Sequence, residues 1–184
     1  MFIKIKDLDL RKLGFDETFM PGDIDLGEDT QQKGPLRSTG RAELVRENRG
    51  ARKVVDDIRV VGSFSTTIEL RCARCLEPVN NPIAEAFDLL YRPQGADAAV
   101  GDDASLGKAE TEIGYYRGEG LLLEEVLKEQ ILLALPVKQV CSASCKGLCA
   151  HCGRNLNVER CDCATTMSDP RWNALEEIRK KLER

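Results

Sequence analysis

Residues 57–75 read DIRVVGSFSTTIELRCARC, and this stretch sets the expected architecture. In its first fifteen residues the even positions are mostly apolar and the odd positions mostly polar. A period of two over this length is typical of a long strand with one buried face, and Gly62 in the middle predicts a bend. The strand runs into Cys72 and Cys75, which are two residues apart. Such a pair at a strand end is typical of a zinc knuckle.

Alternation continues on both sides of this strand. Ala42 and Leu44 alternate with charged residues before it, and Asn48-Arg49-Gly50 is suited to a hairpin turn. After it, apolar side chains occupy odd positions over residues 83–91, and Pro93 ends the pattern. Strands this close in sequence usually pair antiparallel, so we expect an antiparallel sheet.

The other segments before residue 120 give weaker patterns. The first ten residues predict a short edge strand, and residues 16–36, which contain several Pro and Gly, predict a loop. Residues 94–109, rich in Ala, Gly and Asp, have no periodicity and predict a mobile loop. Residues 112–117 predict one further strand.

Helical periodicity begins near residue 121 and ends at Pro136, which predicts a helix near 121–135. Ser168-Asp169-Pro170 predicts the start of a second, short helix. The expected fold class is therefore α+β, a mainly antiparallel sheet or partly open barrel with a central helix. We expect residues 1–136 to form the sheet domain and residues 137–184 a cysteine-rich zinc module with a C-terminal helix.

The chain contains eight cysteines, six of them within residues 141–163. So dense a cluster leaves little room for an apolar core, and tetrahedral sets of thiolates select zinc. The Cys-x2-Cys pair at 149 and 152 can face the Cys-x-Cys pair at 161 and 163 across a short loop. We predict one zinc ion held by Cys149, Cys152, Cys161 and Cys163, and a second held by Cys72, Cys75, Cys141 and Cys145.

Other arrangements of the cysteines remain open. Cys72 and Cys75 could be free, with one zinc ion in the C-terminal cluster, and His151 could replace one thiolate, although it fits better as a spacer. An iron–sulfur cluster also uses four cysteines. A thioredoxin-like redox site is disfavoured because Pro78 and Pro82 oppose a helix after the first pair. Four thiolates fill the shell of a zinc ion, so the predicted sites are structural.

Composition limits the class of protein. No basic segment leads into an apolar run at the start, and no apolar run reaches the ~20 residues of a membrane span, so we expect a cytoplasmic protein without a membrane partner. In that reducing compartment clustered thiols are metal ligands more often than disulfides. The sequence contains no catalytic constellation and no evident small-molecule site, so we expect no enzyme.

The net charge is −4, but it is unevenly distributed. Residues 33–74 carry ten Lys and Arg against five acids, whereas residues 75–135 carry four against twelve. The basic region is a candidate surface for RNA phosphates, although such a region is more often simply a solvated face. Its candidate residues are Arg37, Arg41, Arg46, Arg49, Arg52, Lys53, Arg71 and Arg74.

Several motifs resemble the YceD family of bacterial and plastid proteins. They are Leu135-Pro136-Val137-Lys138, Cys145-Lys146-Gly147-Leu148-Cys149, Cys152-Gly153-Arg154-Asn155-Leu156-Asn157 and Cys161-Asp162-Cys163, with Cys72-Ala-Arg-Cys75-Leu76-Glu77-Pro78 upstream and Asp169-Pro170-Arg171 near the end. The resemblance extends over about residues 40–184. It implies a role in the accumulation of large-subunit ribosomal RNA and hence in ribosome assembly.

Three hypotheses of function follow. The first is a non-enzymatic assembly factor that contacts large-subunit ribosomal RNA, a precursor ribosome or a ribosomal protein. The second is a protein-binding module whose acidic region holds a basic ribosomal protein before assembly. The third is a thiol enzyme or an RNA-processing enzyme with magnesium on carboxylate pairs such as Asp102–Asp103 or Glu124–Glu125; adjacent acids are more often simply solvated.

Overall fold

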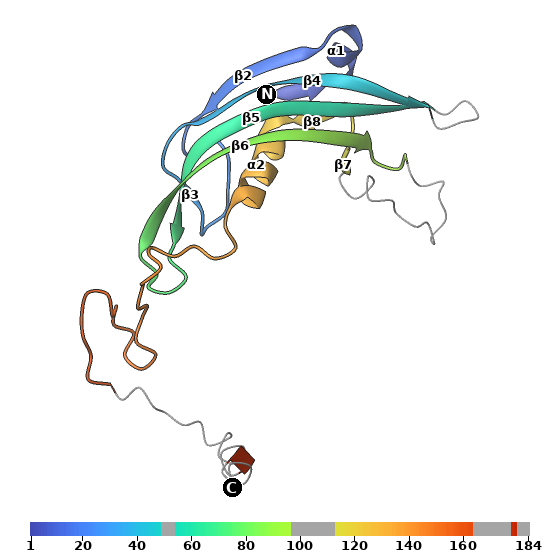
Figure 1. Cartoon of the computed structure of the whole chain (residues 1–184). Helices are drawn as coiled ribbons and strands as arrows, with labels where there is room; N and C mark the ends of the chain where they lie inside the picture. The colour runs from blue at the N-terminus through green and yellow to red at the C-terminus, as the bar shows by residue number, and fades with distance from the viewer. Residues whose placement is uncertain (49–53, 97–112, 164–177, 180–184) are drawn as a thin grey trace.

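The computed structural model describes residues 1–48, 54–96, 113–163 and 178–179 of the chain. Its main feature is a curved sheet whose long strands arch over one helix, with the cysteine-rich loops beyond one end of the sheet (Figure 1). The strand order of this sheet is β2-β4-β5-β6-β7, and β3 pairs with β5 off that path. Within the described residues this path does not close, so the sheet is open.

The two central hairpins follow the predicted pattern. β4 (Leu36–Asn48) and β5 (Val54–Arg71) are antiparallel, and β5 is also antiparallel to β6 (Pro78–Pro93). Between residues 58 and 68 the even side chains of β5 are buried, and Ile58, Val60 and Ile68 are fully so, which confirms the period of two. The turn predicted at residues 48–50 lies partly outside the described residues.

Gly40 and Gly62 lie opposite each other at the middle of the β4–β5 pair. A Cβ atom on Gly40 would lie 2.4 Å from the carbonyl oxygen of Val61 and 2.5 Å from the ring of Phe15. Neither contact is sterically possible. Only glycine therefore fits where the curved strands approach most closely.

Two predictions for the outer strands are wrong. Residues 16–36 are not all loop, because β2 (Leu13–Phe19) pairs with β4 along its whole length and β3 (Gln31–Gln32) pairs with β5. The predicted strand at 112–117 exists as β7 (Ile113–Tyr116), but it runs parallel to β6, not antiparallel. The long connection from 94 to 112 provides the length that a parallel crossover requires.

A second, two-stranded sheet pairs the start of the chain with residues 120–122. β1 (Phe2–Lys4) is antiparallel to β8 (Gly120–Leu122). The predicted edge strand in the first ten residues is therefore three residues long, and α1 (Ile5–Leu10) follows it. β8 leads directly into α2 (Leu123–Ala134), which confirms the predicted central helix.

The core lies between the concave face of the sheet and α2. On α2 the buried residues are Leu123, Val126, Leu127 and Ile131, which recur at helical spacing. They pack with the even side chains of β5 and with odd side chains of β6, such as Phe87 and Tyr91. One layer of sheet and one helix thus bury a single core, as in an α+β fold.

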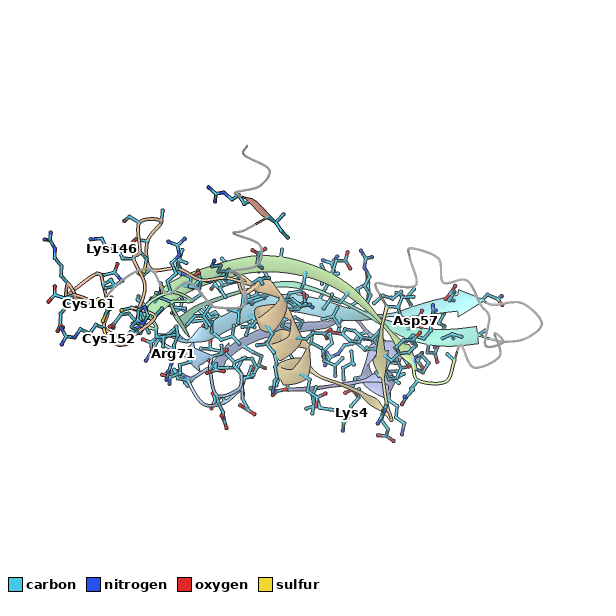
Figure 2. All side chains as sticks on the ribbon, turned by 90° about the horizontal axis from the view of Figure 1, so that it is seen from below. Lys4, Asp57, Arg71, Lys146, Cys152 and Cys161 are labelled. Carbon is cyan, nitrogen blue, oxygen red and sulfur yellow. The ribbon has the colours of Figure 1, made fainter. Side chains whose placement is uncertain are left out.

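The end of the sheet opposite the cysteine-rich loops contains a buried ion pair (Figure 2). Arg92 on β6 is 3% exposed and Asp57 on β5 is 1% exposed, and the guanidinium donates two hydrogen bonds of 3.2 and 2.9 Å to the carboxylate. Arg92 also contacts Glu47. The bidentate geometry compensates the two charges for their loss of water.

Within the described part of the chain, no helix is both long enough and apolar enough to cross a membrane. The mobile loop predicted at 94–109 and the helix predicted after Ser168 fall almost entirely outside the described residues. The division into domains 1–136 and 137–184 stays a prediction.

Candidate metal centres

The eight cysteine thiols meet in two sets of four. One set is Cys72, Cys75, Cys141 and Cys145, which we call the inner site, and the other is Cys149, Cys152, Cys161 and Cys163, which we call the outer site. In each set all four sulfurs lie within 4.8 Å of one another, and neither set includes a histidine. The structure thus brings the cysteines together in the partition that the spacing predicts, and not in the alternative that leaves Cys72 and Cys75 free.

The spacing of the sulfurs fits a single tetrahedral ion. Zinc–sulfur bonds of about 2.3 Å in a tetrahedron place the sulfurs about 3.8 Å apart. In the inner site Cys72 Sγ lies 3.9 Å from Cys145 Sγ, and Cys75 Sγ lies 3.7 Å from Cys141 Sγ. A disulfide needs about 2.05 Å, and all eight cysteines are unbridged. An iron–sulfur cluster would place several iron and sulfide atoms between the thiolates, which fits this close spacing less well.

Each site contains one tight Cys-x2-Cys turn of the same form. The amide of Leu76 donates to the carbonyl oxygen of Cys72 at 2.9 Å, and the amide of Gly153 donates to that of Cys149 at 2.9 Å. The residue after the second cysteine is left-handed in both turns, with φ of 62° at Leu76 and 70° at Gly153. Glycine adopts this conformation freely, whereas leucine is strained in it. The geometry of the turn therefore overrides the preference of Leu76.

Backbone amides in these turns point at the first sulfur of each pair. They lower the pKa of Cys72 to about 6, mainly through the amide of Cys75, with further hydrogen bonds from the amides of Arg74 and Cys141. The amides of Cys152 and His151 likewise lower the pKa of Cys149 to about 6. Hydrogen bonds to the charged form favour the thiolate, which is the form that binds metal. The two turns thus favour the thiolate of the first cysteine in each pair.

Asn157, from the loop of the outer site, reaches the inner site. Its side-chain amide donates to Cys145 Sγ at 3.3 Å and to Asn155 Oδ1 at 2.8 Å, and its Oδ1 accepts a hydrogen bond from the amide of Lys146 at 2.8 Å. Asn155 in turn donates to Glu77 Oε1 at 3.1 Å. A ligand sulfur of one site is therefore oriented by the loop of the other.

Arg74 clamps the same junction from the sheet side. Its guanidinium donates to the carbonyl oxygens of Ala143 (3.2 Å) and Cys145 (2.9 Å), and its own carbonyl accepts from the amide of Leu148 at 3.0 Å. At Gly147, with φ of 76°, a Cβ would lie only 3.0 Å from that carbonyl. Glycine is required here because the chain passes so close to the turn that ends β5.

The two sites differ in burial. In the inner site Cys72, Cys75 and Cys145 are 0%, 3% and 5% exposed, and Cys141 is exposed. In the outer site Cys152 is exposed, and the other three are only half-buried. Figure 2 shows Cys152 and Cys161 at the tip of the molecule beyond Arg71, with Lys146 nearby. The inner site joins the sheet to the C-terminal loops, whereas the outer site closes a local loop.

The predicted RNA residues do not gather at one place. Arg37 and Arg41 are exposed on the outer face of β4, and Arg71 is exposed where β5 ends. Arg46 lies near the other end of β4, where it pairs with Asp9 and, at 3.3 Å, with Asp56. Arg74 is the clamp described above. Arg49, Arg52 and Lys53 lie outside the described residues.

Sequence reasoning missed two residues of this junction. Asn157 carried no signal beyond its place in a motif, and Arg74 was read as part of a charged surface. Their roles depend on contacts across 12 residues for Asn157 with Cys145 and 71 residues for Arg74 with Cys145. The one signal that could have found Asn157 is the run Asn155-Leu156-Asn157 between two cysteine pairs, because asparagine side chains readily bond nearby backbone and loop groups.

Comparison with known proteins finds a matching family model and related proteins from plants and bacteria. The model of the family described as large ribosomal RNA subunit accumulation protein YceD matches residues 60–179. A protein of Arabidopsis thaliana named large ribosomal RNA subunit accumulation protein YCED homolog 1, chloroplastic, is 24% identical over 148 residues, which cover 68% of this chain and 46% of the relative. An uncharacterized protein of Mycobacterium tuberculosis is 31% identical over 125 residues, which cover 68% of this chain and 57% of the relative.

The chain thus spans about half the length of the curated relatives that it matches. No solved structure matches it. The matched range contains all eight cysteines of the two sites and more than half of the 184 residues. The chain belongs to the YceD family.

Proposed function

We propose that this protein is a non-enzymatic factor that promotes the accumulation of large-subunit ribosomal RNA and acts on a scaffold held by two structural zinc ions. The observation that carries the proposal is the family match over residues 60–179, because that family is described by its role in the accumulation of this RNA. The plant relative bears the same description. The contacts with RNA or with a ribosomal protein are the part that the surfaces of this chain must supply.

The metal part of the proposal rests on the two four-thiol sets. Two sets of four thiols, with sulfurs 3.7 and 3.9 Å apart in the inner site and within 4.8 Å of one another in both, favour zinc over harder ions. Zinc bound there would hold the C-terminal loops against the end of β5. Because four thiolates would fill its coordination shell, neither ion would keep a position for substrate or water. This supports a structural and not a catalytic role.

The RNA part of the proposal rests on three exposed arginines, Arg37, Arg41 and Arg71. The sheet around Arg37 forms a shallow hollow of about 480 Å³, which is lined mostly by small residues (Thr39, Ser63, Ser65, Ala84 and Ala86) together with Phe64 and Glu85. A guanidinium beside small hydroxyl residues suits phosphate and ribose contacts, which are independent of sequence and weaken with salt.

Complementation tests this function. In cells that lack the gene, we expect the wild-type chain to restore the level of large-subunit ribosomal RNA and the Arg37→Ala/Arg41→Ala variant to restore it only in part. Lys4→Ala/Arg11→Ala is the matched control, because both of these residues are exposed and belong to the N-terminal segment. Full restoration by the arginine variant would exclude this surface. No change in RNA level on loss of the gene would exclude the proposed function.

A protein partner is the second candidate, and the acidic region 75–135 favours it, since its charge complements a basic ribosomal protein. Affinity isolation of the tagged, metal-loaded chain, with and without nuclease, separates the two candidates. Retention of a ribosomal protein after nuclease treatment would favour direct protein binding. Loss of every protein partner with enrichment of large-subunit RNA would favour direct RNA binding. Cleavage of precursor RNA by the pure chain would contradict the non-enzymatic part.

A further inference from the structure

One edge of the main sheet is open along most of β6. β5 pairs with β6 on one side over residues 78–91, but on the other side β7 pairs only with residues 90–93. Within the described residues, the strand pairs and the further backbone hydrogen bonds leave the outer side of residues 78–89 without a backbone partner. In Figure 2, β6 (green) forms the rim of the sheet between the cysteine loops and β7. Such an edge is a template for another strand.

The direction of the backbone groups along this edge can be worked out. In an antiparallel strand, successive residues direct their N–H and C=O alternately to the two neighbouring strands. The amide of Gln94 donates to the carbonyl oxygen of Tyr116 in β7 at 2.9 Å, so the even residues of β6 face the outer side. Pro78 and Pro82, which have no N–H to give to β5, are also even. The amides of Ala84, Ala86 and Asp88 therefore point away from β5.

The edge from Ala84 to Asp88 is accessible to a partner. Ala84, Glu85 and Ala86 are all exposed, which is unusual for consecutive residues of a strand that alternates between two faces. The two alanines place only a methyl group beside the edge. From Ala84 to Asp88 the edge is about 13 Å long at a rise of about 3.3 Å per residue, enough for about five residues of a partner strand. Pro82 interrupts the edge on one side, and β7 occupies it on the other.

The charge on the edge strand itself is negative, whereas Arg37 and Arg59 lie on the neighbouring strands beside Ala84 and Asp88. Residues 76–91 contain three acids, Glu77, Glu85 and Asp88, and no Lys or Arg. Asp88 is neutralised by Arg59, which donates hydrogen bonds of 2.8 and 2.6 Å to its carboxylate. Glu85 is exposed on the edge itself, and α2 below β6 carries the exposed Glu125 and Glu129. This combination favours a cationic segment over a neutral or acidic one.

Two segments of this chain are disfavoured as the strand that binds this edge. Residues 97–112 carry five acids and one lysine, so they would bring negative charge to a negative edge. A second copy of β6 would place Glu85 near its equivalent and repel it in the same way. A foreign cationic segment satisfies both the open amides and the charge.

We propose that the edge of β6 from Ala84 to Asp88 binds an extended, Lys- or Arg-rich segment of a partner protein by adding it to the sheet as a strand in line with β7. Main-chain hydrogen bonds to the even residues give the affinity, and Glu85 selects basic side chains. The site would serve the proposed function if the partner belongs to the assembling subunit, but it is defined by its chemistry and is tested without reference to that function.

The test uses the metal-loaded full chain and three capped eight-residue peptides. The first alternates lysine with valine, the second alternates glutamate with valine, and the third is the lysine peptide with alternate backbone amides N-methylated. We expect the lysine peptide to bind at least about tenfold more tightly than either of the others, since each alteration removes one of the two contributions. Hydrogen exchange should slow at the amides of Ala84, Ala86 and Asp88 when it binds.

Variants separate strand addition from general attraction between opposite charges. Ala86→Pro removes one edge amide without removing a hydrogen bond to β5, and we expect it to weaken the lysine peptide by about tenfold. Ala86→Ser keeps the amide and should bind within about threefold of the wild type. Circular dichroism and thermal melting check that each variant is folded. If Ala86→Pro does not fold, the exchange of the wild-type amides still decides the question.

The outcomes are distinct. Protection of these amides, together with sensitivity to N-methylation, supports the proposal. Equal binding of the methylated peptide, or protection elsewhere without change at Ala84 and Ala86, overturns it and leaves only non-specific charge attraction. Dimerisation of the chain through this edge, detected by ultracentrifugation and abolished by Ala86→Pro, also overturns it, because the occupant would then be a second copy.

Discussion

Asn157→Asp tests whether the loop of the outer site orients a ligand of the inner site. The substitution keeps the shape of the side chain and keeps Oδ1, which accepts the hydrogen bond from the amide of Lys146 at 2.8 Å. It replaces the amide that donates to Cys145 Sγ at 3.3 Å and to Asn155 Oδ1 at 2.8 Å with a carboxylate oxygen. A donor to the thiolate is lost, and a negative charge faces it instead.

The size of the effect follows from the role of that donor. Residues that hydrogen-bond to metal ligands typically change metal affinity by about 10–100-fold when they are replaced. Because Asn157 supplies the one side-chain donor to Cys145 Sγ, among the described residues, that is not itself a metal ligand, we expect a loss within that range at the inner site. The outer site contains no ligand in contact with Asn157 and should keep its affinity.

Competition with a chelator of known affinity measures this change. The wild-type chain should give two tightly bound ions, and the Asn157→Asp chain should give one ion of unchanged affinity and one that is weaker by the predicted factor. Asn80→Asp is the control, since it adds the same charge at an exposed asparagine of β6. Wild-type affinity at both sites of the Asn157→Asp chain would refute the reasoning, as would an equal loss in the control.

Three further predictions concern other parts of the structure. A chelator in excess should remove metal in two phases, with the outer site emptied first, because three of the four inner ligands are buried and none of the outer ligands is. Cys149→Ser/Cys152→Ser should abolish the fast phase, and a single phase in the wild type would argue against a difference between the sites. Asp57→Ala should destabilise the fold by about 3 kcal/mol in urea unfolding, since it leaves the buried Arg92 without its main partner, and a change under about 1 kcal/mol would show that the pair is not needed. Burial, and then the nearby Glu129, raise the pKa of Tyr91 well above its usual value, so the folded state keeps this proton when the unfolded state has lost it; stability should therefore be complete below about pH 10 and decline above it. If the tyrosinate absorbance of the folded protein shows that Tyr91 ionises near pH 10, this prediction is wrong.

The central part of the fold was predictable because its signal is local. The alternation of Ile58, Val60 and Phe64 with polar neighbours reflects one buried face, and the structure buries all three. The helix of residues 123–134 was predictable for the same reason, since its apolar positions recur at helical spacing and Pro136 ends the pattern. In both cases burial against one surface imposes a period on the sequence.

β2 and the direction of β7 were not predictable in this way. β2 (Leu13–Phe19) contains a glycine and two acids in seven residues, and its pairing with β4 depends on residues 17 to 29 positions away. β7 is four residues long, and its parallel direction depends on the path of the connection before it. Short edge strands acquire their structure from the neighbour on which they pair, so propensity alone says little about them.

The metal centres show the same division. The partition of the eight cysteines followed from spacing, because Cys-x2-Cys and Cys-x-Cys pairs can each present two sulfurs to one ion. The clamp at Arg74 and the contact of Asn157 with Cys145 could not be read from the sequence, since both arise only after the two sites are placed side by side. Arg46, expected on an RNA surface, instead pairs with acids from two other segments.

Metal content measured on the purified chain and its cysteine variants tests the central claim most directly. Elemental analysis should give two zinc ions per chain for the wild type, and one each for Cys72→Ser/Cys75→Ser and for Cys149→Ser/Cys152→Ser, as four sulfurs in each set require. Iron in place of zinc would contradict the identity of the metal. If the wild type binds only one zinc per chain and the Cys72→Ser/Cys75→Ser variant still binds one, the inner site does not bind metal. The account of how the C-terminal loops are held to the sheet would then be wrong.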